Sequence, residues 1–269
     1  MPEGHTLHRL ARLHQRRYAG APVRVSSPQG RFATEAAQLD GATFLRADAH
    51  GKHLFHDYGP LGVVHVHLGL YGTFTESKLP ETEPVGQVRL RLSGRTHWTD
   101  LRGPTRCELL TEPEADAIIA RLGPDPLRRD ARPEPAWQRI TRSRTSIAAL
   151  LMDQKVLSGV GNVYRAEVLF RHGLTPMLAG RDLDETVWKA MWDDLVALMR
   201  AGVRSGRIDT VADEHLPEVT GRAPRKDRHG GEVYVYRRAG QPCLVCGTSV
   251  AHTELAGRHL YWCPTCQPA

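Results

Sequence analysis

Residues 243–266 read CLVCGTSVAHTELAGRHLYWCPTC and hold four of the five cysteines of the 269-residue chain. They form two pairs with two residues inside each pair, Cys243 with Cys246 and Cys263 with Cys266. Each pair fits a tight turn that aims two thiolates at one point, and two pairs complete a tetrahedral zinc site with no open position. The spacing predicts one structural zinc ion in a C-terminal unit over residues 237–269. Two pairs of reduced cysteines on adjacent hairpins are the alternative.

Helical patterns dominate the chain before this unit. Residues 145–171 indicate two helical segments, the first entered through Thr145 or Ser146 as N-cap and the second running from about Asn162 to Arg171. Residues 184–206, DETVWKAMWDDLVALMRAGVRSG, indicate a longer helix with its aromatic, leucine and methionine residues on one face. The helical domain is thus expected over residues 145–236. Its last part, residues 206–232, shows no period and many charges, which predicts a mobile loop.

An antiparallel β domain is expected further toward the N-terminus. From Val23 to about Leu110, short runs alternate polar and apolar residues with glycines between them. A proline- and arginine-rich stretch over 122–137, LGPDPLRRDARPEPAW, then interrupts both periodicities. The sequence therefore predicts an α+β chain whose N-terminal domain covers residues 1–127 and whose interdomain linker covers residues 128–144.

Composition sets broad limits on the function. Hydrophobic residues make up 41% of the chain and charged residues 25%, which is typical of soluble globular proteins. No apolar run approaches the length of a membrane span and no secretory leader is visible, so a cytoplasmic location without a membrane partner is expected. The net charge of +6 favours a polyanionic partner without proving one.

A glycine-rich turn precedes the second helical segment. Residues 158–165 read SGVGNVYR, with Gly159 and Gly161 ahead of Asn162. Glycine-rich backbone that enters a helix N-terminus presents N–H groups and a partial positive charge, which suits a phosphate group. A simple hinge or a helix C-cap is the alternative.

Four separated motifs together resemble one known family. They are MPEGHTLHRL at 1–10, GKHLF at 51–55, LMDQKVLSGVGNVYRAEVLFRHGLTP at 151–176, and VYRRAGQPCLVCG with GRHLYWCPTCQ within 235–267. Their order is that of the formamidopyrimidine-DNA glycosylase and endonuclease VIII family, and the chain looks most like the actinobacterial endonuclease VIII branch. The resemblance spans nearly the whole chain. It implies an N-terminal antiparallel β-sandwich with flanking helices, a helix-two-turn-helix module, and a zinc finger on a β-hairpin.

The resemblance assigns the chemistry to the start of the chain. In this family the initiator methionine is removed and the secondary amine of Pro2 becomes the nucleophile. An α-amino group has a reference pKa of about 7.7–8.0, against about 10.4 for lysine, so much more of it is unprotonated at neutral pH. The family pattern gives Glu3 acid–base duty and places Lys52 on a strand near the phosphates of the lesion. Without the resemblance, Pro2 and Glu3 would be read as a helix start and Lys52 as surface charge.

The same resemblance implies the DNA contacts. Asn162 and Arg258 match the phosphate clamp around a nucleotide that has left the base stack. Leu70 and Tyr71, in HLGLYG, match residues that fill the gap left by the base, although Gly69 stands where that branch has a polar side chain. Ordinary strand residues are the alternative for Leu70 and Tyr71.

These observations predict a bifunctional DNA glycosylase and abasic-site lyase of base excision repair. The expected substrates are oxidised pyrimidines in duplex DNA, with strand cleavage by successive β- and δ-elimination. A preference for oxidised purines such as 8-oxoguanine and a non-catalytic damaged-DNA-binding module are the alternatives. A bacterial monomer without a catalytic metal is expected. His65 and His67 lie two residues apart on one strand, and a solvated or DNA-facing edge is expected there rather than a metal pair.

Overall fold

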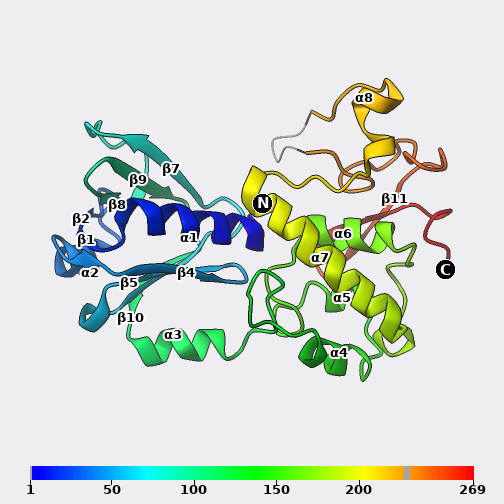
Figure 1. Ribbon diagram of the computed structural model, residues 1–269, viewed down its shortest axis with the longest axis horizontal. Coiled ribbons are helices and arrows are strands. Elements are labelled where there is room, and N and C mark those ends of the chain that lie inside the picture. The colour runs from blue at the N-terminus through cyan, green and yellow to red at the C-terminus, as the bar shows by residue number, and fades with distance from the viewer. Residues whose placement is uncertain (1, 227–230) are drawn as a thin grey trace. The chain divides into compact units, whose positions relative to one another are not determined.

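The protein is described here by a computed structural model of residues 2–226 and 231–269. The chain divides into two compact units, Met1–Arg121 and Leu122–Ala269 (Figure 1). Among the described residues, none of the helices combines the length and apolar character of a membrane span.

The first unit contains two four-stranded antiparallel sheets. One sheet has the order β10-β6-β5-β4, and its strands are Arg106–Leu110, Val63–His67, His53–Asp57 and Arg46–His50. The other has the order β2-β8-β9-β7, and its strands are Arg24–Ser26, Val88–Ser93, His97–Arg102 and Thr73–Lys78. Two short strands, β1 (Ala21–Pro22) and β3 (Thr43–Phe44), pair separately. Apolar side chains from both large sheets share one core, which confirms the predicted β-sandwich.

Helix α1 (Gly4–Tyr18) packs against β4 and β5. Its buried face follows helical spacing through Leu7, Ala11, His14 and Tyr18, while arginines take the exposed positions. Two further helices, α2 (Ala33–Leu39) and α3 (Glu112–Ile119), and a short 3-10 turn, η1 (Gly59–Leu61), complete the unit. The helices that flank the sheets are therefore present as predicted.

A pair of buried histidines joins α1 to the sheet beneath it. Nδ1 of His14 lies 2.9 Å from Nε2 of His56, and both side chains are fully buried. Burial lowers the pKa of His14 from 6.5 to about 3 and holds the pKa of His56 well below its usual value. Both rings are therefore neutral in the folded protein at neutral pH.

This pair predicts acid sensitivity. Since the unfolded chain binds protons near pH 6.5 and the folded chain does not, stability is complete above that pH and falls as the pH decreases toward the folded values. We expect the free energy of unfolding to fall by about 1.4 kcal/mol per pH unit for each such histidine. Urea titrations between pH 4 and 8 measure this slope. His14→Gln should reduce it and the exposed His252→Gln should not; equal slopes in all three proteins would contradict the assignment.

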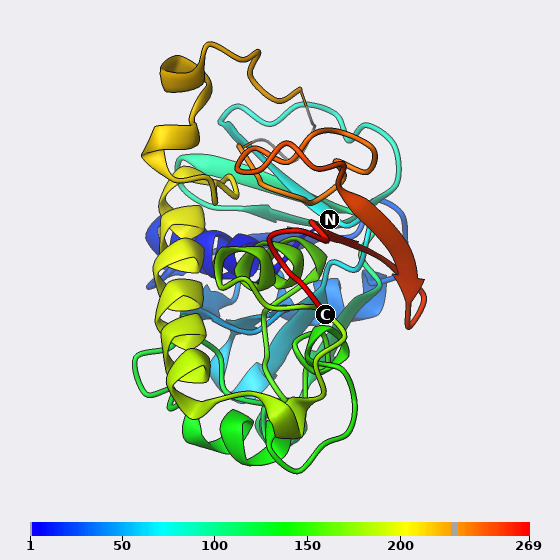
Figure 2. The same cartoon turned by 90° about the vertical axis from the view of Figure 1, so that its right-hand side faces the viewer.

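The second unit is mainly helical (Figure 2). Its helices are α4 (Glu134–Ile140), α5 (Ile147–Leu150), α6 (Asn162–Arg171), α7 (Glu185–Ser205) and α8 (Pro217–Thr220). The 3-10 turns η2 (Gly180–Asp182) and η3 (Asp213–His215) and the hairpin of β11 (Ala251–Leu255) and β12 (Arg258–Trp262) complete it. Helix α7 begins after Asp184, whose carboxylate accepts hydrogen bonds from two backbone amides, and ends at Ser205, followed by the C-cap Gly206 with φ of 79°.

Two segments differ from the sequence-based boundaries. Residues 128–144, expected as an interdomain linker, lie within the second unit and contain α4, whose Ala136 and Ile140 are fully buried in the core of that unit. The proline-rich composition hid this short helix, because Pro133 and Pro135 stand at its start, where proline is tolerated. The segment 206–232 contains η3 and α8, while residues 227–230 of this predicted loop lie outside the described residues.

Candidate active site and DNA-contact residues

The start of the chain lies ahead of α1 rather than inside it. The helix begins at Gly4, and Glu3 is its N-cap with extended backbone angles of −120° and 178°. The Glu3 side chain is fully buried and makes no capping hydrogen bond to α1. Pro2 is half-buried immediately before it. A buried carboxyl group therefore stands next to the residue that the resemblance implies as nucleophile.

The resemblance suggested that Lys52 lies within a strand, but the structure places it in a turn. It follows Gly51 in the two-residue connection between β4 and β5, where His50 and His53 face each other. Gly51 has φ of 56°, a conformation that favours glycine. The hairpin thus projects a half-buried lysine from one end of the sheet.

The turn between β6 and β7 exposes two large apolar side chains. Leu70 is 44% exposed and Tyr71 is 86% exposed, although Leu68 just before them is buried. Gly69 has φ of 66°, and a Cβ atom there would lie 1.8 Å from Oγ1 of Thr105. The backbone therefore requires glycine at position 69, which explains the absence of a polar side chain. Leu70 and Tyr71 are turn residues rather than ordinary strand residues.

His65 and His67 differ in their surroundings. His65 is 1% exposed, so the expected solvated edge is wrong for this residue, while His67 at the end of β6 is half-buried. His65 instead contacts His53 of β5 and Glu108 of β10. Sequence reasoning missed this cluster because its three members come from three different strands.

In the second unit, α6 is fastened to the zinc-finger hairpin. Nδ2 of Asn162 donates to the backbone oxygen of His259 at 2.9 Å, and Arg165 donates to the same oxygen at 3.0 Å and also to Oδ1 of Asn162. Arg258 is exposed at the start of β12, directly before His259. The structure therefore brings the two predicted clamp positions, Asn162 and Arg258, into one neighbourhood.

The glycine turn before α6 is held by a side chain that the sequence did not point to. Oε1 of Gln154 accepts the amide of Gly159 at 2.9 Å, and Nε2 of Gln154 donates to the carbonyl of Val160 at 3.0 Å. Gly161 is the N-cap residue of α6. The turn is therefore a fixed element that precedes Asn162, not a loose hinge.

Glu167 is a second polar residue that sequence reasoning missed. It lies in α6, is fully buried, and its carboxylate accepts the backbone amides of Tyr234, Val235 and Tyr236 at 2.6–2.9 Å. Oγ1 of Thr210 donates to it at 2.6 Å. Since α6 is buried on all sides from Asn162 to Phe170, its one acidic residue needs such partners, and no local sequence pattern identifies them.

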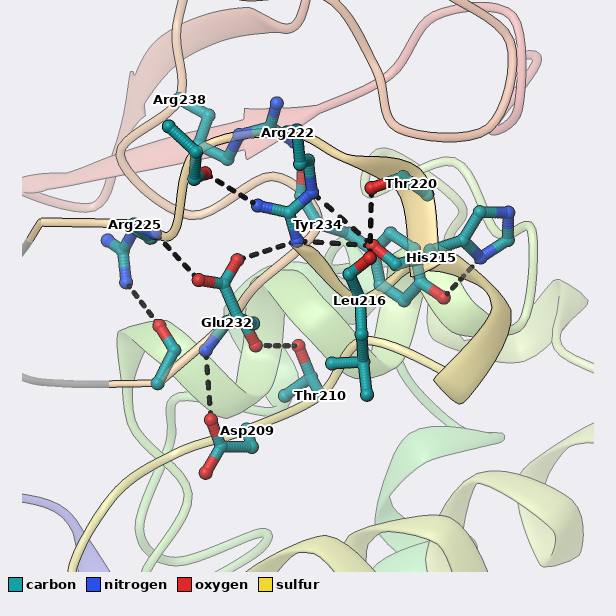
Figure 3. A network of polar contacts seen from close by, with 12 residues as sticks. Asp209, Thr210, His215, Leu216, Thr220, Arg222, Arg225, Glu232, Tyr234 and Arg238 are labelled. Carbon is teal, nitrogen blue, oxygen red and sulfur yellow. Dashed lines mark hydrogen bonds and ion pairs between the residues drawn. The ribbon is translucent and has the colours of Figure 1, made fainter. Parts of the chain in front are cut away.

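Glu232, at the end of the segment 206–232, binds residues near the start of that segment (Figure 3). Its carboxylate lies 2.6 Å from Nη2 of Arg222 and accepts the amide of Arg225 at 2.6 Å. Its backbone amide donates to Asp209 at 2.9 Å, and its carbonyl accepts the amide of Thr210 at 2.9 Å. The described parts of the predicted mobile loop are therefore anchored at their base.

The four cysteines of the zinc finger gather at one point. Among the described residues they form the group suited to a metal, with all four Sγ atoms within 4.8 Å of one another. The Sγ atoms of Cys243 and Cys266 are 3.9 Å apart and those of Cys246 and Cys263 are 3.4 Å apart, close to the edge of about 3.8 Å that Zn–S bonds of about 2.3 Å require. Hydrogen bonds from Thr248 lower the pKa of Cys246, whereas burial raises the pKa of Cys263 and that of Cys266.

Comparison with protein-family models matches three consecutive parts of the chain. Residues 1–107 match the formamidopyrimidine-DNA glycosylase N-terminal domain, and residues 122–213 match the formamidopyrimidine-DNA glycosylase H2TH domain. Residues 240–269 match a zinc finger found in FPG and IleRS. The zinc-finger match and the cysteine cluster together indicate a structural zinc site.

Similar proteins cover the whole chain. Endonuclease 8 1 of Mycobacterium tuberculosis is 58% identical over 99% of this chain and 100% of that protein. Probable endonuclease 8 2 of Streptomyces coelicolor is 32% identical over 99% of this chain and 94% of that protein. A solved complex between the Lactococcus lactis Fpg and an abasic site containing DNA has the same fold, with a TM-score of 0.79 at 20% identity and coverage of 99% and 100%. The chain therefore belongs to the formamidopyrimidine-DNA glycosylase and endonuclease 8 family, whose members are DNA glycosylases and abasic-site lyases of base excision repair.

Proposed function

We propose that this protein excises oxidised pyrimidines from duplex DNA and cuts the strand at the resulting site, with the amine of Pro2 as nucleophile. The observation that carries the proposal is the place of Pro2 and Glu3, which precede α1 with a fully buried glutamate beside a half-buried proline. The pyrimidine preference is supported by the likeness to proteins named endonuclease 8 along nearly the full chain.

The proposed chemistry follows from a free amine at the processed N-terminus. The nitrogen of Pro2 attacks C1′, the damaged base leaves, and an iminium ion forms on the opened sugar. Glu3 delivers a proton to the sugar ring oxygen and shuttles protons afterwards. Because an iminium withdraws electrons, the proton on C2′ becomes acidic and its removal expels the 3′ phosphate. A second elimination expels the 5′ phosphate, so the strand is left with a gap.

The DNA contacts are proposed for residues of both units. Lys52 in the first unit, and Asn162 and Arg258 in the second, bind phosphates around the extruded nucleotide. Leu70 and Tyr71 occupy the space that the base leaves, which suits two exposed apolar side chains on a turn of fixed geometry. The segment 206–232 contributes to base selection.

One structural zinc ion per chain is proposed for the four cysteines, with no metal in the reaction. A monomer that acts on the chromosome in a bacterial cytoplasm completes the proposal. Elemental analysis of the purified protein tests the metal: one zinc per chain is expected, and iron or no metal would contradict the assignment.

A panel of duplexes with single defined lesions tests the function. Faster excision of oxidised pyrimidines than of 8-oxoguanine is expected, and the reverse order would favour the purine-specific alternative. Borohydride reduction with abasic-site DNA separates an enzyme from a non-catalytic binding module, because only a working amine leaves a covalent protein–DNA adduct. Absence of the adduct would contradict the lyase mechanism.

Removal of the Arg258 charge is expected to weaken binding to damaged duplex DNA. If Arg258 binds one phosphate, Arg258→Ala should reduce the slope of log affinity against log salt by about 0.9. Titrations of fluorescent abasic-analogue duplex at several salt concentrations measure this slope. Arg181→Ala removes an exposed arginine of the same unit and is the control. A slope equal to that of the control would remove Arg258 from the phosphate contacts.

A further inference from the structure

A line of polar side chains crosses the first sheet beside Lys52. His53 begins β5 opposite His67 of β6, and His65 of β6 lies opposite both Phe55 of β5 and Glu108 of β10. Side chains two residues apart on a strand, and those directly opposite on neighbouring strands, point to the same face. The antiparallel register therefore gathers His53, His65, His67 and Glu108 on one face.

Three of these side chains form a continuous hydrogen-bonded chain. Nδ1 of His65 lies 2.9 Å from Oε1 of Glu108, and Nδ1 of His53 lies 2.8 Å from Nε2 of His65. A carboxylate only accepts, so His65 donates from Nδ1, and its Nε2 then accepts the Nδ1 proton of His53. At the other end of this hydrogen-bonded series, Nε2 of His53 therefore carries a lone pair that can accept a proton. The rings of Phe55 and His53 stack on His65, at 21° and 17°, and hold this geometry.

The two ends of the chain have different surroundings. Glu108 is 35% exposed, and Arg106 lies 3.5 Å from its second oxygen, so this end meets water. At the other end, His53 directly follows Lys52 in the sequence. Burial lowers the pKa of His67, and His65, Lys52 and Arg106 act in the same direction.

Both histidine rings of the relay are neutral at rest. Burial lowers the pKa of His53 to about 3, and His65, His67, His50 and Arg106 act in the same direction. Burial also lowers the pKa of His65, against the opposing effect of Glu108. At neutral pH each histidine therefore carries one ring proton and one unprotonated ring nitrogen, so it can accept a proton at one nitrogen and release one from the other.

We propose that His53, His65 and Glu108 form a proton relay that leads from the Lys52 end of the sheet to water. A proton binds Nε2 of His53, the Nδ1 proton of His53 passes to Nε2 of His65, and the Nδ1 proton of His65 passes to Glu108, which releases it. One proton crosses, no electrons are transferred, and both rings end as the opposite neutral tautomer. The relay rests on the proposed function, because the first elimination releases one proton from the sugar, and this is the proton that the relay carries. Its members act without contacting the DNA.

Glu108→Gln tests the relay, because the amide oxygen still accepts the hydrogen bond from His65 but does not take up a proton. The readout is single-turnover strand cleavage of abasic-site duplex at several imidazole concentrations and constant ionic strength. We expect cleavage at least about tenfold slower than in the unmodified protein in dilute buffer. Imidazole should restore it, since a mobile base replaces the missing acceptor, while cleavage by the unmodified protein should not depend on imidazole. Glu83→Gln, an exposed glutamate of the same unit, should behave as the unmodified protein.

His65→Phe is the second variant, since it keeps a stacked ring and breaks the chain of donors. The same imidazole-dependent loss is expected, with circular dichroism showing that the protein is folded. A rate equal to that of the unmodified protein in Glu108→Gln, or a loss that imidazole does not restore, would overturn the relay. Borohydride trapping of the unmodified protein reports separately on Pro2: without an adduct the proposed nucleophile fails, while the imidazole dependence of strand cleavage still decides the relay.

Discussion

A chain that retains Met1 ahead of Pro2 is expected to cut abasic-site DNA at least about a thousandfold more slowly than the processed chain. Retention converts the proline nitrogen into a tertiary amide, whose lone pair is delocalised and no longer attacks C1′. The buried Glu3 stays in place, so acid–base assistance alone remains. Single-turnover cleavage and the yield of borohydride-trapped adduct measure the loss.

Pro2→Gly is the matched variant for this experiment. After methionine removal it presents a primary α-amine in the same place, so it separates the need for a free amine from the need for the proline ring. We expect reduced trapping in Pro2→Gly and no trapping in the blocked chain. Full trapping in both proteins would show that another group is the nucleophile. Mass spectrometry of each preparation establishes which first residue is present.

Glu167→Ala is expected to lower the free energy of unfolding by at least about 4 kcal/mol. The variant leaves three backbone amides and one hydroxyl without their buried acceptor, and each unsatisfied buried donor costs about 1–3 kcal/mol. Those amides belong to residues 234–236, which lie between Glu232 and the zinc finger. The destabilisation should therefore extend to the contacts of Glu232 and to the zinc finger. Urea unfolding followed by tryptophan fluorescence measures the change, because Trp188 and Trp192 lie in the core of this unit.

Glu185→Gln is the control for Glu167→Ala. Glu185 is half exposed and pairs with Lys189 one helical turn away, so its replacement should change stability by less than about 0.5 kcal/mol. Equal stability of the Glu167→Ala and Glu185→Gln proteins would show that water satisfies the amides of residues 234–236 as well as the carboxylate does.

The sequence predicted those features that local spacing determines. The cysteine pairs, the N-cap at Thr145 or Ser146, which the structure places at Ser146, the helix from Asn162 to Arg171 and the long helix α7 all depend on residues a few positions apart. Family resemblance supplied the rest of the candidate site. The structure places Leu70 and Tyr71 in an exposed turn and Asn162 beside the hairpin, and it places Lys52 in a turn and not in a strand.

Features that depend on distant partners were not predictable in this way. Glu167 looks like any polar helical residue until the chain returns at residues 234–236, and Glu108 is an ordinary strand glutamate until β6 lies beside it. Helix α4 was missed because its composition resembles that of a connection. For Gly69, only the approach of Thr105 shows why a polar residue is excluded. Buried polar groups and close backbone approaches are tertiary properties, so no local pattern specifies them.

The backbone oxygen of His259 receives hydrogen bonds from both Asn162 and Arg165. Any displacement of β12 must therefore break two contacts to the first turn of α6 at once. Metal binding by the hairpin and the order of the first turn of α6 are therefore thermodynamically coupled, and such coupling is reciprocal. A chelator that extracts the ion should loosen that turn, and a ligand that immobilises the turn should slow extraction of the ion.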